Sequence, residues 1–204
     1  NWDVQLKTGG EFLRGFELSQ HVRPVQYNSD FPVRISIDSN VYPHIAITCW
    51  QLVKENDIWV VRQIEELPAS DPENTASQAA KKIIAWLKSI KYSGRVFLHG
   101  DKSTKNRNNI DDNKRSFFQI INENIIDAGY NTQDCMPVSA PPVSAVADFV
   151  NAIFTQEVKF AKFEIGEHCK KSINDYIETK TDKDGTMLKN RITDPKTKVS
   201  YEPH

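Results

Sequence analysis

The stretch that most constrains the fold is residues 33–50, VRISIDSNVYPHIAITCW, which predicts two strands joined by a turn. Apolar and polar residues alternate from Arg34 to Asp38, the period of a strand with one buried face. Residues 41–44 interrupt the pattern, and β-branched and aromatic residues resume from Ile45 to Trp50. Asp38 therefore lies where the first strand ends. Taken alone, an Asp there fits a turn residue as well as it fits a ligand.

Regular spacing along the rest of the chain predicts an α/β fold. A third strand is expected at residues 58–65, after a hairpin turn at Asn56-Asp57, so the first three strands form an antiparallel meander. Apolar residues at three- and four-residue spacings predict helices at 75–90, 112–128, 141–154 and 169–179. Further strands are expected at 95–99, 135–138 and 160–165. This order predicts a mixed sheet, the meander plus parallel strands, flanked by helices.

The chain divides by composition into three segments. Residues 1–32 are irregular but contain Trp2, Phe12 and Phe16, so we expect a linker that docks in part on the core. Residues 33–179 carry the regular pattern. Residues 180–204 are rich in Lys and Thr around an Asp182–Gly185 turn, which predicts a hairpin or a mobile arm. In the helix at 141–154, the expected buried residues are Val143, Val146, Ala147, Val150, Ile153 and Phe154.

Composition excludes several classes of protein. No apolar run is long enough to span a membrane. Cys49, Cys135 and Cys169 are odd in number and far apart, which argues against a disulfide framework or a zinc site. The formal net charge is -1, so binding to nucleic acid would depend on a local basic patch.

Two strand ends carry the candidate chemistry. The nearly continuous apolar run at residues 95–99 is typical of a central strand, and Gly100-Asp101 follows it. If this fourth strand lies beside the first, Asp38 and Asp101 come together. Adjacent carboxylates repel and need a cation or a proton. Oxygen ligands of this kind suit Mg²⁺ or Mn²⁺, and two such ions about 3.5–4 Å apart are the usual arrangement for displacement at phosphorus.

A basic segment follows Asp101 directly. Next to a metal site its charges would bind DNA phosphates, although alone it would more simply be a solvated surface. The residues concerned are Lys102, Lys105, Arg107, Lys114 and Arg115.

The chain resembles the nuclease domain of the large terminase subunit of tailed bacteriophages, which has an RNase H-like fold. The matching pieces, in order, are Gly15-Phe16-Glu17 to His21-Val22, residues 37–43 (IDSNVYP), Gly100-Asp101-Lys102-Ser103, Phe149-Val150-Asn151 and residues 169–189. The resemblance implies that Asp38 and Asn40 form the DxN at the end of the first strand. It implies that Asp101 is the second metal-binding acid.

One part of the resemblance is missing. The third acid of the family lies in a segment of the form GHxxDAxRY, and we expect it beyond His204. Asp175, Asp182 and Asp194 do not match that segment. Glu65, at the end of the third strand, is a weaker substitute and is better interpreted, with Asn40, as a residue next to the metal ligands.

The resemblance implies a two-metal-ion endonuclease, using Mg²⁺ or Mn²⁺, that cuts concatemeric double-stranded DNA during genome packaging. Expected partners are the ATPase half of the same subunit, preceding Asn1, the small terminase subunit and the portal protein. The expected location is the cytoplasm of a bacterial host. With two acids, this chain should cut slowly or not at all. The alternatives are another RNase H-like nuclease, such as a junction resolvase, and a non-catalytic domain that clamps DNA or docks the motor.

Overall fold

The computed structural model describes residues 9–39, 44–106, 114–188, 192–193 and 200–201. It contains two compact units. The first unit comprises Asn1–Val25, Val53–Arg62 and Pro141–His204, and the second comprises Gln26–Leu52 and Gln63–Ala140. Strands β3 (His44–Glu55) and β4 (Ile58–Glu66) contribute residues to both units. In the described part of the chain, no helix has the length and apolar character needed to cross a membrane.

The second unit is built on a mixed sheet. Strand β2 (Arg34–Asp38) pairs antiparallel with β3 and parallel with β6 (Val96–Gly100), and β6 pairs parallel with β7 (Thr132–Asp134). The strand order is β4-β3-β2-β6-β7, and the short β5 (Ala69–Ser70) pairs with β3. The structure confirms that the strand expected at residues 95–99 lies beside the strand expected at 34–38, and that the sheet is mixed.

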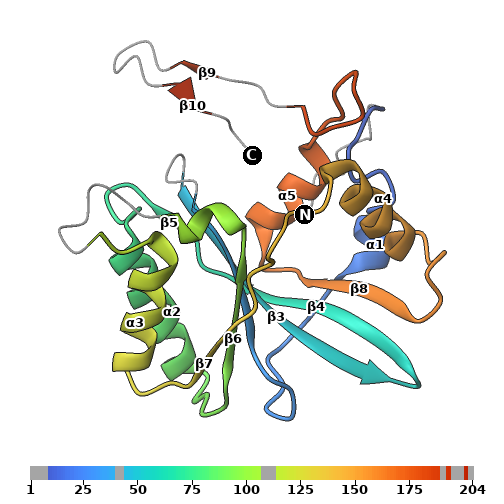
Figure 1. Ribbon diagram of the computed structural model, residues 1–204. Coiled ribbons are helices and arrows are strands. Elements are labelled where there is room, and N and C mark those ends of the chain that lie inside the picture. Colours follow the sequence, from blue (N-terminus) through green and yellow to red (C-terminus); the bar gives the residue numbers. More distant parts are fainter. Residues whose placement is uncertain (1–8, 40–43, 107–113, 189–191, 194–199, 202–204) are drawn as a thin grey trace. The chain divides into compact units, whose positions relative to one another are not determined.

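Helices α2 (Ala76–Ser89) and α3 (Phe117–Asp127) lie side by side and cover one face of this sheet (Figure 1). The hydroxyl of Thr75 caps α2, and Ser116 forms a capping box with Gln119 at the start of α3. Both helices bury apolar stripes, as the spacing predicted. The covered face of the sheet carries the fully buried side chains Ile35, Ile37, Val96 and Leu98.

The first unit has its own core. Strand β1 (Val22–Arg23) pairs parallel with β8 (Ala161–Gly166), which lies beside β4. Helices α1 (Leu18–His21), α4 (Val143–Phe154) and α5 (Lys170–Glu178) complete it, and β9 (Ile192–Thr193) pairs antiparallel with β10 (Ser200–Tyr201). Its centre is a cluster of rings, termed here the aromatic cluster: Phe16, His21, Phe154, Phe163 and Tyr176.

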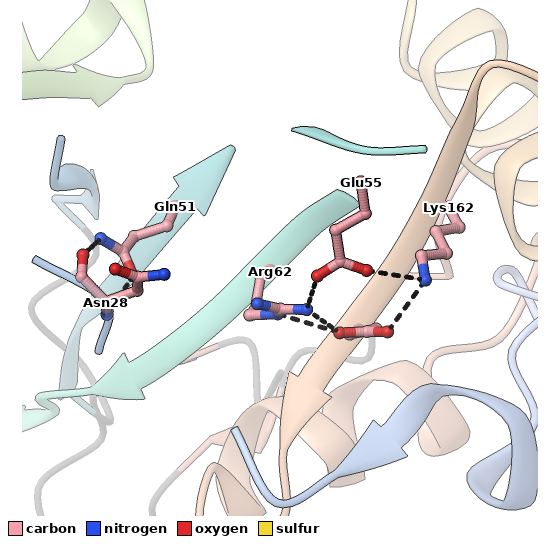
Figure 2. A network of polar contacts seen from close by, with 6 residues as sticks. Asn28, Gln51, Glu55, Arg62 and Lys162 are labelled. Carbon is pink, nitrogen blue, oxygen red and sulfur yellow. Dashed lines mark hydrogen bonds and ion pairs between the residues drawn. The ribbon is translucent and has the colours of Figure 1, made fainter. Parts of the chain in front are cut away.

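Polar side chains tie each unit together (Figure 2). In the first unit Arg62 donates hydrogen bonds to Glu55 (3.0 Å) and Glu164 (2.7 Å), and Lys162 pairs with both acids. In the second unit the buried side chain of Gln51 accepts from the Asn28 N–H and donates to its carbonyl oxygen. These groups satisfy one another, which indicates a structural role.

Three local predictions were wrong. The helix expected from residue 112 begins at Phe117, because Ser116 caps it. The edge strand is at Thr132–Asp134 and not at 135–138, because the Asp134 carboxylate accepts from the Met136 N–H and turns the chain. In α4, Val143 and Val146 are exposed, and Asn151 is buried among residues predicted to be apolar.

The division into 1–32, 33–179 and 180–204 stays a prediction. The expected docking of the first segment is seen for Phe12 and Phe16, which are buried, whereas Trp2 lies outside the described residues. The predicted turn at Asp182 is present, since its N–H donates to Thr186 and its carbonyl oxygen accepts from Gly185.

Candidate active site

The register of β2 and β6 brings two acids to neighbouring positions. Ile37 is paired with Gly100 in the parallel ladder. Asp38 is the last residue of β2, and Asp101 is the first residue after β6, so each lies one step beyond that pair. Adjacent strands are about 4.8 Å apart, which makes the two acids neighbours at the carboxyl ends of central parallel strands.

Both acids belong to the face of the sheet that α2 and α3 do not cover. Side chains alternate along a strand, so Asp38 shares its face with Arg34, and Asp101 shares its face with Phe97 and His99. The contacts of Arg34 show that these two rows lie on the same face. Its guanidinium carbon is 4.6 Å from the centroid of the Phe97 ring, and its Nη1 is 3.2 Å from Nε2 of His99.

Gly100 lets the two strand ends approach closely. A Cβ at this position would collide with the carbonyl oxygen of Ile37 and lie 3.0 Å from Cε of Met136. Backbone cannot move aside as the end of a flexible side chain can. The glycine that precedes Asp101 is therefore required for space.

The turn after β6 is built onto Asp101. The 3-10 helix η1 (Lys102–Lys105) begins with the N–H and the hydroxyl of Thr104 donating to the Asp101 carbonyl oxygen, at 3.0 and 2.6 Å. The Ser103 hydroxyl donates to Oδ2 of Asp101 at 3.0 Å. Thr104 is buried, whereas Asp101 is exposed. The structure thus holds the backbone of this acid firmly and presents its carboxylate to solvent.

The predicted basic residues that the structure describes differ in their contacts. Lys102 is exposed, but Lys105 donates to Oδ2 of Asp134 at 2.5 Å, and its ammonium is 5.4 Å from the centroid of the Phe118 ring. Arg115 is paired with Glu123 at 3.1 Å, and Lys114 is exposed. Arg107 lies outside the described residues, as does Asn40.

The Lys105 contact perturbs its partner. Partial burial acts to raise the pKa of Asp134, but the hydrogen bonds from Lys105 and the Met136 N–H outweigh it, so the pKa lies below its usual range. At neutral pH the Asp134 carboxylate is ionised and accepts hydrogen bonds from Lys105 and the Met136 N–H. It was not singled out in the sequence, where it only precedes the edge strand expected at residues 135–138.

Among the described residues, no other acid forms a metal-binding group with the pair. Glu65, in β4, accepts a hydrogen bond from the Glu66 N–H at 3.0 Å. Asp175 and Asp182 belong to the first unit, and Asp194 lies outside the described residues. Among the described residues, no group of three or more His, Cys, Asp or Glu side chains could hold a metal ion. The chemistry of the two oxygen donors fits Mg²⁺ or Mn²⁺, and they make up part of a ligand set.

His99 is half-buried on the acid face. A guanidinium can only donate, so Nε2 of His99 is the acceptor toward Arg34, and geometry assigns the ring proton to Nδ1. Burial and then the charge of Arg34 lower the pKa of His99. The ring is therefore neutral at pH 7 and pairs with Arg34 without competing for the acids.

Comparison with known proteins identifies the fold. No family model matches the sequence, and no curated protein matches it. The nuclease domain of the P22 large terminase superposes with a TM-score of 0.60 at 14% identity, covering 91% of this chain and 87% of that domain.

The large terminase of a thermophilic bacteriophage, in complex with ADP, superposes with a TM-score of 0.56 at 14% identity. The match covers 89% of this chain and 41% of the thermophilic phage protein, so this chain spans less than half of that subunit. The resemblance seen in the sequence is confirmed as a shared fold. The chain has the RNase H-like fold of the nuclease domains of phage large terminases.

Proposed function

We propose that this chain is the nuclease domain of a terminase large subunit and that it hydrolyses phosphodiester bonds of double-stranded DNA with the help of divalent cations. The observation that carries the proposal is the Ile37–Gly100 register, which makes Asp38 and Asp101 neighbours. Two neighbouring carboxylates are unfavourable without a cation, and fold alone would not indicate an activity.

Asp38 and Asp101 would hold Mg²⁺ or Mn²⁺, and the proposal includes two ions. When bound, such ions neutralise charge on the phosphodiester and lower the pKa of the attacking water. The Ser103 hydroxyl orients the Asp101 carboxylate, and Gly100 keeps the two acids close. Asn40 and Glu65 are proposed to lie next to the metal ligands.

The phosphate contacts proposed for this domain come from Lys102, Arg107, Lys114 and Arg115. Lys102 is the best supported, because it is exposed and directly follows Asp101. Arg115 would have to exchange Glu123 for a phosphate. Such contacts position DNA without reading its sequence, so we expect little sequence preference.

The wider setting is proposed from the fold. The substrate would be concatemeric DNA during packaging, in the cytoplasm of a bacterial host. The partners would be an ATPase half of the same subunit, the small terminase subunit and the portal protein. The length of the thermophilic phage subunit relative to this chain supports an additional half.

A second candidate is a non-catalytic domain that clamps DNA. It is favoured by the finding that the described residues contain no cluster of three metal-binding side chains. In such a domain the basic residues would still bind DNA phosphates, but the two acids would have no catalytic role.

Nicking of supercoiled plasmid tests the proposal. The wild-type chain should nick in Mn²⁺ and not in EDTA. Asp38→Asn should reduce the rate by more than the roughly 100-fold that loss of a residue next to a metal ligand can cost. Asp57→Asn, at the exposed β3–β4 turn, is the matched control and should cut normally. Gel retardation in EDTA, with no nicking in Mn²⁺ by this chain or by a form extended past His204, would establish the clamp instead.

A longer chain tests the expectation of a third acid. Extension past His204 should raise the rate strongly, and Mn²⁺ should support the short form better than Mg²⁺, because Mg²⁺ demands stricter geometry. Equal rates for the two lengths would place the third acid within the 204 residues.

A further inference from the structure

The carboxylate of Asp134 joins two segments next to Asp101. Its Oδ2 accepts from the Lys105 ammonium at 2.5 Å, and its Oδ1 accepts from the Met136 N–H at 2.9 Å. Lys105 ends the η1 turn that begins after Asp101, whereas Met136 belongs to the segment that leaves β7. Both oxygens of one acid thus fasten the turn to the end of β7.

Further contacts also hold the η1 turn against the segment that follows β7. The hydroxyl of Thr104 lies 3.8 Å from Sδ of Met136, and Met136 also packs against Gly100. The Lys105 ammonium lies over the ring of Phe118, which α3 holds in the core. The turn is therefore connected to β7, to α3 and to the residue before Asp101.

Lys105 points away from the acid face. In the β6–β7 ladder Asp134 is paired with Leu98, whose buried side chain faces the helices. Paired residues of parallel strands share a face, and the Phe118 contact on α3 agrees with this. An ammonium on the helix side of the sheet is poorly placed to touch a phosphate held by acids on the other side.

We propose that Asp134 and Lys105 are positioning residues, which hold the η1 turn so that the Asp101 carboxylate keeps its place beside Asp38. Lys105 is thereby assigned to the support of Asp101 and not to DNA. The consequence for metal binding rests on the proposed function, whereas the support of the turn does not. Exposed ion pairs contribute little to global stability, so the effect is local.

Amide hydrogen exchange tests the support of the turn without metal or DNA. The reporters are the N–H groups of Thr104 and Asn106, which donate within the turn at 3.0 Å. Asp134→Asn and Lys105→Met should each speed their exchange by about two- to fivefold, the range expected for losing one exposed ion pair. Glu73→Gln is the control, since it breaks the Lys82 pair (2.8 Å) elsewhere in the same unit. Unchanged exchange in both variants would overturn the proposal.

Metal and DNA titrations test the consequence. In both variants the Mn²⁺ concentration for half-maximal nicking should rise about tenfold, as for other residues that orient metal ligands, while the rate at saturating Mn²⁺ changes little. Lys105→Arg, which keeps the charge for Asp134, should restore most of the Mn²⁺ affinity.

Binding to DNA in EDTA should keep its salt dependence in Lys105→Met. A slope lowered by about 0.9 would show that Lys105 contacts a phosphate, and would overturn the assignment. If neither the wild type nor the form extended past His204 nicks DNA, the proposed function fails, and the exchange experiment still decides whether Asp134 and Lys105 support the turn.

Discussion

The aromatic cluster of the first unit and the acid pair of the second both bring polar side chains together, but with opposite outcomes. In the cluster, Nε2 of His21 donates to the Phe154 carbonyl oxygen (3.2 Å), and Nδ1 accepts from the Glu17 N–H (2.9 Å). The buried Asn151 accepts from the Gly15 N–H (2.9 Å) and donates to the Phe12 carbonyl oxygen (3.0 Å). Buried polar groups that are paired in this way stabilise one fold.

The acid pair has the opposite arrangement. Asp38 and Asp101 are like charges at neighbouring positions, and Asp101 is exposed to solvent. Their negative charges repel each other, and a bound cation would relieve that repulsion. The aromatic cluster therefore contributes stability, whereas the acid pair places two like charges at one edge of the sheet.

The largest expected effect comes from removing a ring of the cluster. Phe16 is 2% exposed and contacts the rings of His21, Phe154, Phe163 and Tyr176. Phe16→Ala should lower the free energy of unfolding by about 3–5 kcal/mol, measured by urea denaturation.

Two controls sharpen this result. Phe149→Ala, on the exposed side of α4, should stay within about 0.5 kcal/mol of the wild type. Asp101→Asn should leave stability unchanged or raise it, because it removes one of two like charges. A loss of stability in Asp101→Asn comparable to that in Phe16→Ala would contradict the comparison.

The next largest effect is expected from alanine substitutions at two crowded glycines, Gly100 beside the acid pair and Gly15 beside the aromatic cluster. Gly100→Ala should cost about 1–3 kcal/mol of stability, because a Cβ collides with the Ile37 carbonyl oxygen, and should also reduce nicking by the folded protein. Gly15→Ala is the matched variant, with a Cβ only 3.0 Å from the Asn151 carbonyl oxygen. It should lower stability and leave nicking per folded molecule unchanged. Equal loss of nicking in the two variants would argue that the regions are not distinct.

Acid should weaken the cluster through His21. Burial lowers the pKa of His21 below its ordinary value of 6.5, although hydrogen bonds to Glu17 and Phe154 oppose the shift. The unfolded chain therefore binds a proton first as the pH falls, so the stability contributed by neutral His21 is present above pH 6.5 and is lost below it. The nearby charges of Glu17 and Arg23 act in opposite directions.

Urea denaturation between about pH 7.5 and about pH 5.5 measures this loss. His21→Gln should be less stable at the higher pH and should show a smaller loss on acidification. His99, whose pKa is also lowered, remains in both proteins and cancels in the difference. An identical pH dependence in the two proteins would exclude His21 as the cause.

The smallest expected effect concerns two basic residues that follow Asp101 in the sequence. Lys102→Ala and Arg107→Ala should each lower the salt slope of DNA binding by about 0.9, measured by titration in EDTA. Lys88→Ala, on α2, is the control for a lysine far from the site in the sequence and should leave the slope unchanged. If all three variants keep the salt slope of the wild type, the segment after Asp101 does not contact DNA and is only a solvated surface.

Local pattern predicted the strands that carry the acid pair. The two-residue period placed Arg34–Asp38 correctly, and the apolar run before Gly100 placed β6 to within one residue. The Asn56-Asp57 turn was also predicted, and both residues have positive φ, as such a hairpin turn requires. These features depend on residues a few positions apart, so the sequence alone contains them.

Contacts between distant segments were decided only by the tertiary structure. Nothing near Asn151 in the sequence shows that it pairs with Gly15 and Phe12, and a polar residue there only interrupts the predicted apolar stripe. The charge of Lys105 is visible in the sequence, whereas its partner, Asp134, lies 29 residues away and is identified only by the fold. A side chain takes its role from the groups that burial and strand register bring against it, and these are set by the whole fold.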